Sequence, residues 1–368
     1  MNRRPVIQKL PAFAGRTIVI SDIHGSLDVY EKLLKKVNYI PGEDRLILLG
    51  DLVEKGTQNL ALLRRIMKQC KDPEVYAVMG NCDFVAKNVL YNYRLDYLNK
   101  VLHFRKNSLI HEMIAEAGLP PLTRKTDMPG LAQELRSRYL PELSFLNDLP
   151  HVIVTPDIIF AHSGISNEVT FGDDFKEIMV RFQFAKEEHS FSRMVVVGHM
   201  PVSEYSTSIA DFNPLFNAAK NIYSIDGGNA VNQAGQLNAL IIHRGLMQQV
   251  HTDLLPKVRV LHTTHPKNSR PVFLGYANSE AEILHAGAEQ SLIHAPSLKR
   301  DLLVDNDFLK DGKAYNYTSY ELPLIAGQTV HLVRIGPKKA QVKHHGVMGW
   351  TALENLDLQN ADLSGLPE

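Results

Sequence analysis

Five short polar segments carry residue types that bind divalent cations, and each follows a run of apolar residues. They read Ser-Asp-Ile-His-Gly (21–25), Gly-Asp-Leu-Val-Glu-Lys-Gly (50–56), Gly-Asn-Cys-Asp (80–83), Phe-Ala-His-Ser-Gly (160–164) and Val-Gly-His-Met-Pro (197–201). Carboxylate and amide oxygens are hard ligands, and imidazole nitrogen is a borderline one. A carboxylate that lies between the others in chain order can bridge two ions. The spacing therefore predicts a site for a pair of divalent cations.

The elements that must position these segments alternate between strand and helix. Apolar runs at 17–20, 46–49 and 75–79 predict strands, and helical spacing of apolar residues over 27–37 and 60–67 predicts helices. A β-α-β-α-β pattern implies mostly parallel strands with right-handed crossovers. Ligands in open α/β sheets bind outside the carboxyl ends of strands, so we expect the five segments to meet there. Each segment alone is more often a helix cap, a turn or a hydrogen-bonded core histidine.

The rest of the chain suggests further parts. We expect a catalytic domain over 1–250, with a charged helical insertion at 84–148 that either caps the cleft or is padding away from it. Further strand-like runs occur at 152–154, 158–160, 194–197, 223–225 and 237–242. A mixed connecting segment, to which no fold is assigned, covers 251–314. Short strands follow at 315–356, and 357–368 is a tail.

Composition limits the functional classes. The 368 residues contain 40 Lys plus Arg and 40 Asp plus Glu, so no basic field favours nucleic acid or an anionic membrane as a partner. Two cysteines form no disulfide framework, which is typical of a reducing cytoplasm. The basic start of the chain lacks the apolar stretch of a signal peptide, and no run approaches the length of a membrane-spanning helix. We expect a cytoplasmic protein.

Together the five segments resemble the motifs of the calcineurin-like metallophosphoesterases, and within them the bacterial phosphoprotein phosphatase (PPP)-type serine/threonine phosphatases. That family reads Asp-x-His-Gly, Gly-Asp-x-Val-Asp-Arg-Gly, Gly-Asn-His-Glu, His-x-Gly and a final Gly-His. Bacterial members often continue Gly-His-Thr-Pro-Val and Ile-Asp-Thr-Gly, compared here with Gly-His-Met-Pro-Val at 198–202 and Ile-Asp-Gly-Gly at 225–228. The resemblance covers residues 16 to about 245. It implies an α/β fold, a metallophosphoesterase β-sandwich flanked by helices.

The resemblance also implies roles for individual residues. The first ion would be held by Asp22, His24 and Asp51, and the second by Asp51, Asn81, His162 and His199. The ions would be Mn, Fe or Zn, with Mn favoured, and a hydroxide between them would attack phosphorus.

Further roles follow for neighbouring residues. Asn81 and Lys55 would contact the substrate phosphate, although Lys55 stands where the family has Arg and is otherwise a solvated surface lysine. Asp83 and Asp226 would support the site from behind.

The acid of the family is altered here. Cys82 replaces the histidine that protonates the leaving oxygen, and Glu54 replaces the aspartate that orients that histidine. The general acid is therefore unknown; another histidine or a water would have to serve. The Gly-Asn-Cys-Asp version is familiar in a phosphodiesterase-like bacterial branch. Arg181 and Arg193 are candidates for a second phosphate-binding arginine, without positional support.

Residues 315–356 resemble a bacterial SH3-like module, a small β-barrel. The residues that carry this resemblance are Leu-Pro at 322–323, Ala-Gly-Gln-Thr-Val at 326–330 and His-Gly-Val-Met-Gly-Trp-Thr-Ala-Leu at 345–353. Such a module implies a possible protein or peptide partner.

Three functions stay open from the sequence. The first is a two-metal phosphatase acting on a phosphorylated protein or a small phosphoester. The second is a phosphodiesterase or dinucleoside-polyphosphate hydrolase on the same ions. The third is a non-catalytic adaptor that keeps the fold and binds a partner through its SH3-like module.

Overall fold

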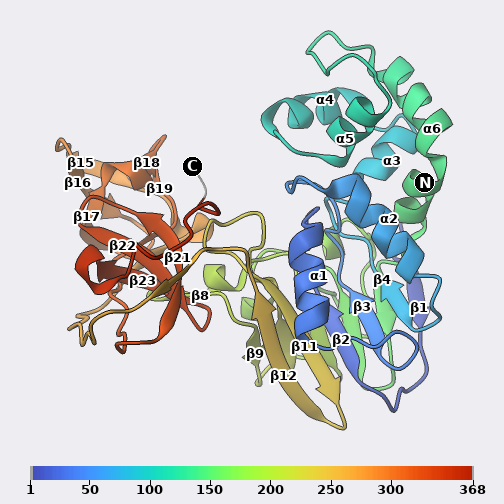
Figure 1. The fold of residues 1–368 in the computed structure, drawn as a ribbon. Helices are drawn as coiled ribbons and strands as arrows, with labels where there is room; N and C mark the ends of the chain where they lie inside the picture. The colour runs from blue at the N-terminus through green and yellow to red at the C-terminus, as the bar shows by residue number, and fades with distance from the viewer. Residues whose placement is uncertain (1–2, 367–368) are drawn as a thin grey trace. The chain divides into compact units, whose positions relative to one another are not determined.

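The alternating pattern of the first eighty residues forms a five-stranded sheet in the structure, a computed structural model that describes residues 3–366. The strand order is β12-β11-β2-β3-β4, in which β2, β3 and β4 are parallel and β11 is antiparallel to both of its neighbours, β2 and β12 (Figure 1). The strands are β2 (Thr17–Ile20), β3 (Arg45–Leu48), β4 (Val75–Ala77), β11 (Leu237–His243) and β12 (Leu246–Thr252). The helices α1 (Leu27–Lys36) and α2 (Asn59–Gln69) form the two parallel crossovers.

A second sheet of six strands has the order β1-β5-β6-β7-β10-β9. Its strands are β1 (Ile7–Lys9), β5 (Val152–Val154), β6 (Ile158–Ala161), β7 (Met194–Val197), β9 (Leu215–Asn217) and β10 (Ile222–Ser224). The β6–β7 and β7–β10 pairs are parallel. The 3-10 helices η1 (Glu177–Met179) and η2 (Phe184–Lys186) lie between β6 and β7 in the chain.

The side chains of these strands divide between two cores because successive strand residues point to opposite faces. Val19 and Ile47 pack with Phe160 and Val196 of the other sheet, so the two sheets form a sandwich. Ile18 and its neighbours on the other face pack with residues of α1, α2 and the later helices. The expected β-sandwich flanked by helices is confirmed.

The segment between β4 and β5 is helical. It contains α3 (Val85–Leu90), α4 (Leu95–Phe104), α5 (Leu109–Glu116) and α6 (Met128–Asp148). The Ser108 side chain accepts a hydrogen bond from the His111 backbone N–H and so caps α5. The long helix α6 is interrupted at Tyr139, which has non-helical φ/ψ angles two residues before Pro141. These helices share the apolar core of α1 and α2.

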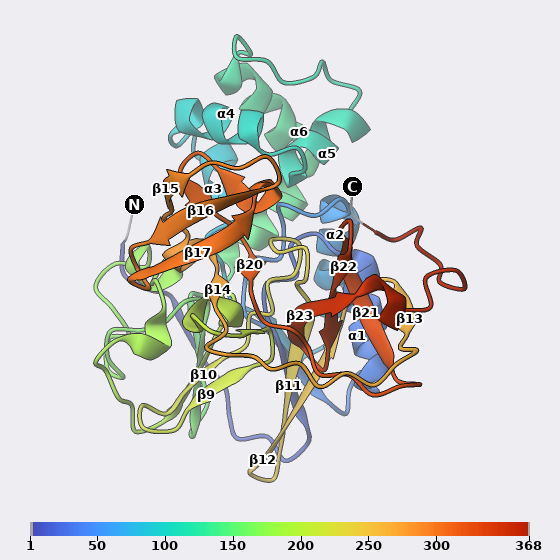
Figure 2. The ribbon, with the colours of Figure 1, turned by 90° about the vertical axis from the view of Figure 1, so that its left-hand side faces the viewer.

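A second unit contains, among the described residues, 201–213, 232–235 and 254–366. One of its sheets has the order β13-β21-β22-β23-β8, and another has β15-β16-β17 (Figure 2). The strands of these two sheets are β8 (Ala210–Asp211), β13 (Lys257–Arg259), β15 (Glu282–His285), β16 (Gln290–Ala295), β17 (Arg300–Asp305), β21 (Thr329–Ile335), β22 (Lys339–His344) and β23 (Val347–Ala352). The short pairs are β14 (Phe273–Leu274) with β20 (Tyr317–Thr318) and β18 (Leu309–Lys310) with β19 (Lys313–Ala314). The 3-10 helices are η3 (Val202–Tyr205), η4 (Tyr276–Asn278), η5 (Asn306–Phe308) and η6 (Leu353–Asn355).

The structure divides the chain differently from the expected boundaries. Residues 201–213 group with the second unit because Asp211 of β8 pairs with Val347 of β23. Residues 232–235 do so because the buried Lys343 side chain donates to the Ala234 carbonyl oxygen at 2.7 Å. The expected connecting segment 251–314 forms strands of this same unit, except for 251–253. The SH3-like character of 315–356 stays a prediction. Within residues 3–366, no helix has the length and apolar character needed to cross a membrane.

Candidate metal centre

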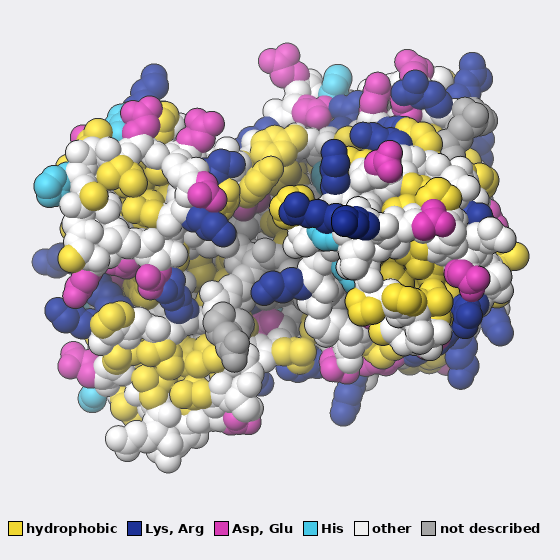
Figure 3. Space-filling model, turned by 90° about the horizontal axis from the view of Figure 1, so that it is seen from above, with side chains coloured by type: hydrophobic (Ala, Val, Ile, Leu, Met, Phe, Trp, Pro, Cys, Tyr) yellow, Lys and Arg dark blue, Asp and Glu magenta, His cyan; other side chains and the backbone are white. Residues whose placement is uncertain are grey.

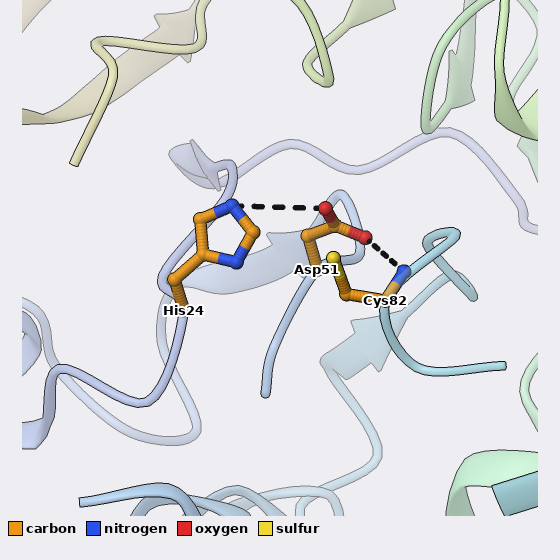
Figure 4. A group of neighbouring side chains, drawn as sticks. All are labelled: His24, Asp51 and Cys82. Carbon is orange, nitrogen blue, oxygen red and sulfur yellow. Dashed lines mark hydrogen bonds and ion pairs between the residues drawn. The ribbon is translucent and has the colours of Figure 1, made fainter. Parts of the chain in front are cut away.

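Asp51 lies between two histidines at the end of β3. Its Oδ2 is 3.6 Å from Nε2 of His24, and its Oδ1 is 3.4 Å from Nε2 of His162. The Cys82 backbone N–H donates to the same Oδ1 at 2.8 Å (Figure 4). Each carboxylate oxygen thus faces a different imidazole, which is the arrangement that a ligand shared by two ions requires.

The surroundings of His162 suit a cation. Its Nδ1 is 2.8 Å from the Leu49 carbonyl oxygen, which can only accept, so Nδ1 carries the hydrogen. In the neutral ring Nε2 then presents a lone pair, 3.0 Å from Oδ1 of Asn81 and 3.4 Å from Asp51. Ligand atoms of Asp51, His162 and His199 all lie within 4.8 Å of one another. Electron pairs that converge in this way are stabilised when a cation lies between them.

Asp22 has an oxygen with no partner in the described structure. Its Oδ2 accepts from the His199 backbone N–H at 3.0 Å and from the Ser21 hydroxyl. Its Oδ1 is buried and accepts no hydrogen bond from residues 3–366, although Nε2 of His24 lies 4.0 Å away. Burial and the neighbouring Asp51 raise the pKa of Asp22 to about 8. A divalent ion at Oδ1 would satisfy this oxygen and favour the ionised carboxylate.

The neutral form is favoured at two histidines of the group. Burial and then the Lys55 ammonium lower the pKa of His24 to about 3. Burial and then His162 lower the pKa of His199 to about 3. A neutral imidazole is the form that binds metal. The donor set and its protonation therefore fit a pair of divalent cations.

The loops that carry these residues have unusual backbone conformations. Asp22, His24, Asp51 and His199 have φ angles of 53°, 50°, 49° and 69°, in the left-handed region that non-glycine residues seldom occupy. Such strain is concentrated at functional sites and persists only where the surrounding structure imposes it. At Gly198, a Cβ atom would meet the side chains of Ser21 and Asp22. The close approach of the loops explains the glycine beside the ligand.

A second group of possible ligands consists of His24, Asp51 and Cys82. The sequence predicts Asp22, and not Cys82, as the third member of this group. Ligand atoms of His24, Asp51 and Cys82 lie within 4.8 Å of one another, and the sulfur lies beside the Asp51 carboxylate (Figure 4). Burial, and then the charge of Asp51, raise the pKa of the Cys82 thiol well above its usual value. The thiol therefore keeps its proton and is a weak hydrogen-bond donor.

The predicted supporting carboxylates have different tasks. Asp83 accepts from the Leu52, Val53 and Gly80 backbone N–H groups at 2.9–3.2 Å, so it holds the loops after β3 and β4 together. Asp226 follows β10 and accepts from the Gly228 backbone N–H at 2.7 Å. Burial and the charge of Asp22 raise the pKa of Asp226.

The Glu54 carboxylate is directed to the helical insertion. It accepts from Arg105 Nη1 at 2.6 Å and from the Leu109 backbone N–H at 3.0 Å. Lys55 places its ammonium 3.2 Å from Nε2 of His24, so it lies inside the group of predicted ligands. Sequence reasoning missed Arg105, because it lies outside every motif and 51 residues from Glu54.

The two arginines proposed from the sequence lie in different places. The backbone N–H of Arg181 donates to the hydroxyl oxygen of Ser163 at 2.8 Å, and Ser163 directly follows His162 in the chain. The Arg181 side chain contacts Glu187 and Ser166. Arg193 is paired with Glu168 at 2.9 Å and precedes β7, at the opposite end of the sandwich. A cavity of about 550 Å³ opens there, and none of the predicted metal ligands lines it.

The fold and the group of ligands agree with a comparison against protein families. Residues 15–215 match the model of the calcineurin-like phosphoesterases, which is more than half of the chain. The chain belongs to the calcineurin-like phosphoesterase family. Its group of candidate ligands agrees with the divalent-metal dependence of that family.

Curated relatives resemble a limited stretch of the chain. The symmetrical bis(5'-nucleosyl)-tetraphosphatase of Actinobacillus pleuropneumoniae serotype 3 (strain JL03) is 40% identical over 90 residues, 24% of this chain and 28% of that protein. The enzyme of the same name from Yersinia pestis (strain Pestoides F) is 45% identical over 67 residues, 18% of this chain and 22% of that one. The matches thus span about a quarter of these relatives.

Among solved structures, a protein serine/threonine phosphatase from Saccharomyces cerevisiae is 12% identical. It covers 72% of this chain and 86% of its own, with a TM-score of 0.42.

Proposed function

We propose that this chain hydrolyses phosphoanhydride bonds of nucleotides, with dinucleoside polyphosphates as the leading substrate class. The observation that carries the proposal is Cys82, a buried thiol beside the Asp51 carboxylate at the position of the family's acid. When a phosphoanhydride bond is hydrolysed, the leaving group is a phosphate, which is stable as an anion. Its oxygen therefore needs little help from a proton donor. An alkoxide from serine or threonine needs such help, which is typically worth about 10²- to 10⁴-fold in rate.

Six residues would hold the ions. Asp22, His24 and Asp51 would hold one ion, and Asp51, Asn81, His162 and His199 would hold the other. When bound, two such ions polarise phosphoryl oxygens and lower the pKa of water. Manganese is the metal we favour, because the donor set mixes carboxylate, amide oxygen and imidazole without a thiolate.

The chain's own groups supply orientation and charge. The Leu49 carbonyl fixes the tautomer of His162, and the Cys82 backbone N–H orients the Asp51 carboxylate. Lys55 would bind a phosphoryl oxygen of the substrate after an ion at Nε2 of His24 displaces its ammonium, which lies 3.2 Å from that nitrogen. A charge-assisted hydrogen bond of this kind is worth about 1.5–3 kcal/mol.

The names of the curated relatives support the same substrate class. Because the matches cover a quarter of those proteins or less, the substrate of this chain is our proposal and not a transferred fact.

Hydrolysis of phosphoprotein monoesters is the second candidate. It is favoured by Pro201, which follows the last predicted ligand by two residues as in the phosphoprotein phosphatases. Non-catalytic adaptor function is disfavoured by the intact donor set. We also propose that the protein is cytoplasmic. We further propose that the SH3-like module binds a peptide partner.

The test is the dependence of kcat/KM on the leaving group, measured with Mn²⁺. Diadenosine tetraphosphate and aryl phosphates should be hydrolysed, phosphoserine peptides slowly, and log kcat/KM should fall steeply as leaving-group pKa rises. Cys82→His should help alkyl monoesters little, because Glu54 is bonded to Arg105 and Leu109 instead of being free to orient an imidazole. A flat dependence in the wild type, with rapid hydrolysis of phosphoserine peptides, would favour the second candidate.

A further inference from the structure

The loop between α4 and α5 is bonded directly to the loop that carries Asp51 and Lys55. The Lys55 backbone N–H donates to the Asn107 carbonyl oxygen at 3.3 Å, and the Asn107 amide donates back to the Lys55 carbonyl oxygen at 3.4 Å. Arg105 and the Leu109 N–H both bind the Glu54 carboxylate. Residues 104–107 are therefore attached beside Lys55, whose ammonium reaches a predicted metal ligand.

Arg105 has hydrogen-bonding capacity left over. Within residues 3–366, only its Nη1 among the guanidinium nitrogens donates a hydrogen bond, and about a third of the side chain, 32%, is exposed. The guanidinium group presents five N–H donors in a rigid fork that matches phosphate oxygens. Since Glu54 fixes one end, the other donors are oriented in advance and a bound phosphate loses less side-chain entropy.

Phe104 is the most exposed large hydrophobic residue among those described, at 86%. It ends α4 and directly precedes Arg105, and the next residue, Lys106, is basic. Viewed from above, the helical insertion displays Lys and Arg side chains next to hydrophobic ones (Figure 3). An aromatic ring next to cations is the combination that binds a nucleotide, because the ring stacks on the base while the cations bind phosphate.

We propose that residues 104–105 form a nucleotide subsite beside the metal centre, with Phe104 stacking on a nucleobase and Arg105 binding a phosphate next to the scissile one. The proposal deepens the proposed function, and it rests on that function for the identity of the scissile bond. It explains why a large aromatic side chain is left in water at a loop that is otherwise tied down by four hydrogen bonds.

Measurements of ligand binding can test this subsite independently of catalysis. With the full chain and Mn²⁺, calorimetry should compare the Kd of a non-hydrolysable ATP analogue with that of inorganic tripolyphosphate, which has the charge but no base. Phe104→Ala should weaken the analogue roughly tenfold, the order of one lost base-stacking contact, and leave tripolyphosphate unchanged. Phe104→Tyr should restore the wild-type value.

Two further variants complete the design. Arg105→Lys keeps a charge beside Glu54 but loses the fork, so it should weaken both ligands several-fold. Tyr91→Ala is the matched control, since Tyr91 is also an exposed aromatic residue of the insertion, at 56%, but lies outside the loop. It should bind both ligands as the wild type does.

The outcomes are distinct for the two proposals. The subsite is refuted if Phe104→Ala binds the analogue as tightly as the wild type does. It is also refuted if the substitution weakens the binding of tripolyphosphate by the same factor as the binding of the analogue. The proposed function fails, with the subsite intact, if the analogue binds better than tripolyphosphate in a Phe104-dependent way while diadenosine tetraphosphate is not hydrolysed.

Discussion

The pair formed by Arg105 and Glu54 should stabilise the fold far more than a surface pair of the same length. Glu54 is fully buried, and its carboxylate has two recorded partners, Arg105 at 2.6 Å and the Leu109 N–H at 3.0 Å. Arg105→Ala leaves a buried charge with one neutral donor. Removing one partner of a fully buried pair costs about 3–5 kcal/mol. Because Arg105 is itself a third exposed, water screens part of this, and we expect about 2–3 kcal/mol.

A matched control exists in the Arg65–Glu31 pair. It has the same 2.6 Å separation, but both side chains are substantially exposed, at 35% and 45%. Arg65→Ala should therefore cost at most about 1 kcal/mol. The measurement is the free energy of unfolding from urea titration, with circular dichroism as the probe and the midpoint compared at constant slope.

A double variant isolates the charge. In Glu54→Gln/Arg105→Ala, the neutral amide still accepts from Leu109 and needs no counter-ion, so most of the lost stability should return. Equal losses for Arg105→Ala and Arg65→Ala would refute the argument. So would a double variant as unstable as Arg105→Ala, since the cost would then come from lost packing of the arginine stem.

Three other changes have defined outcomes. Asp51→Asn should lose most bound metal, measured by elemental analysis, and roughly 10²-fold or more in rate; full activity in this variant would exclude Asp51 as the shared ligand. Gly198→Ala should weaken metal binding and lower the free energy of unfolding by about 1–3 kcal/mol, because the new Cβ would displace Asp22. At Gly42 a Cβ would meet no atom within 4 Å, but φ is +78°, so Gly42→Ala measures the cost of backbone strain alone. Burial and then Lys87 lower the pKa of His151 to about 4, so the unfolded chain takes up this proton first and stability should fall as pH drops from 6.5 towards 4. His151→Gln should lessen that fall by roughly 2–3 kcal/mol in urea unfolding; an unchanged pH profile would contradict the shift.

Local sequence predicted the strands best where an apolar, β-branched run ends in a turn residue. The runs at 17–20, 152–154 and 194–197 are strands with those bounds in the structure. The meeting of the ligand segments could be anticipated because parallel strands bring their carboxyl ends to one edge. Asp51, His162 and His199, from loops after β3, β6 and β7, do lie within 4.8 Å of one another.

Long-range pairing without a local pattern could not be predicted. The two-residue strand β8 is recognisable only through its partner β23, about 140 residues later in the chain, which is why residues 201–213 were expected in the first domain. Residues 254–314 have short strands whose apolar residues contribute to cores shared with later segments. Arg105 belongs to the same class, since a helix end in a charged insertion gives no sign that it reaches a buried carboxylate.

The backbone of the site indicates how the fold maintains it. Four predicted ligands adopt left-handed φ angles, and each such residue costs on the order of 1–3 kcal/mol. Asp22 adds a buried, partly unsatisfied carboxylate. A chain can retain these costs only where neighbouring structure fixes the loops. Here Asp83 binds three backbone N–H groups, and Glu54 ties the loop after β3 to the insertion. The insertion is thus part of what holds Asp51 in place, so loss of the contacts that Arg105 and Leu109 make with Glu54 should disturb the geometry of the centre.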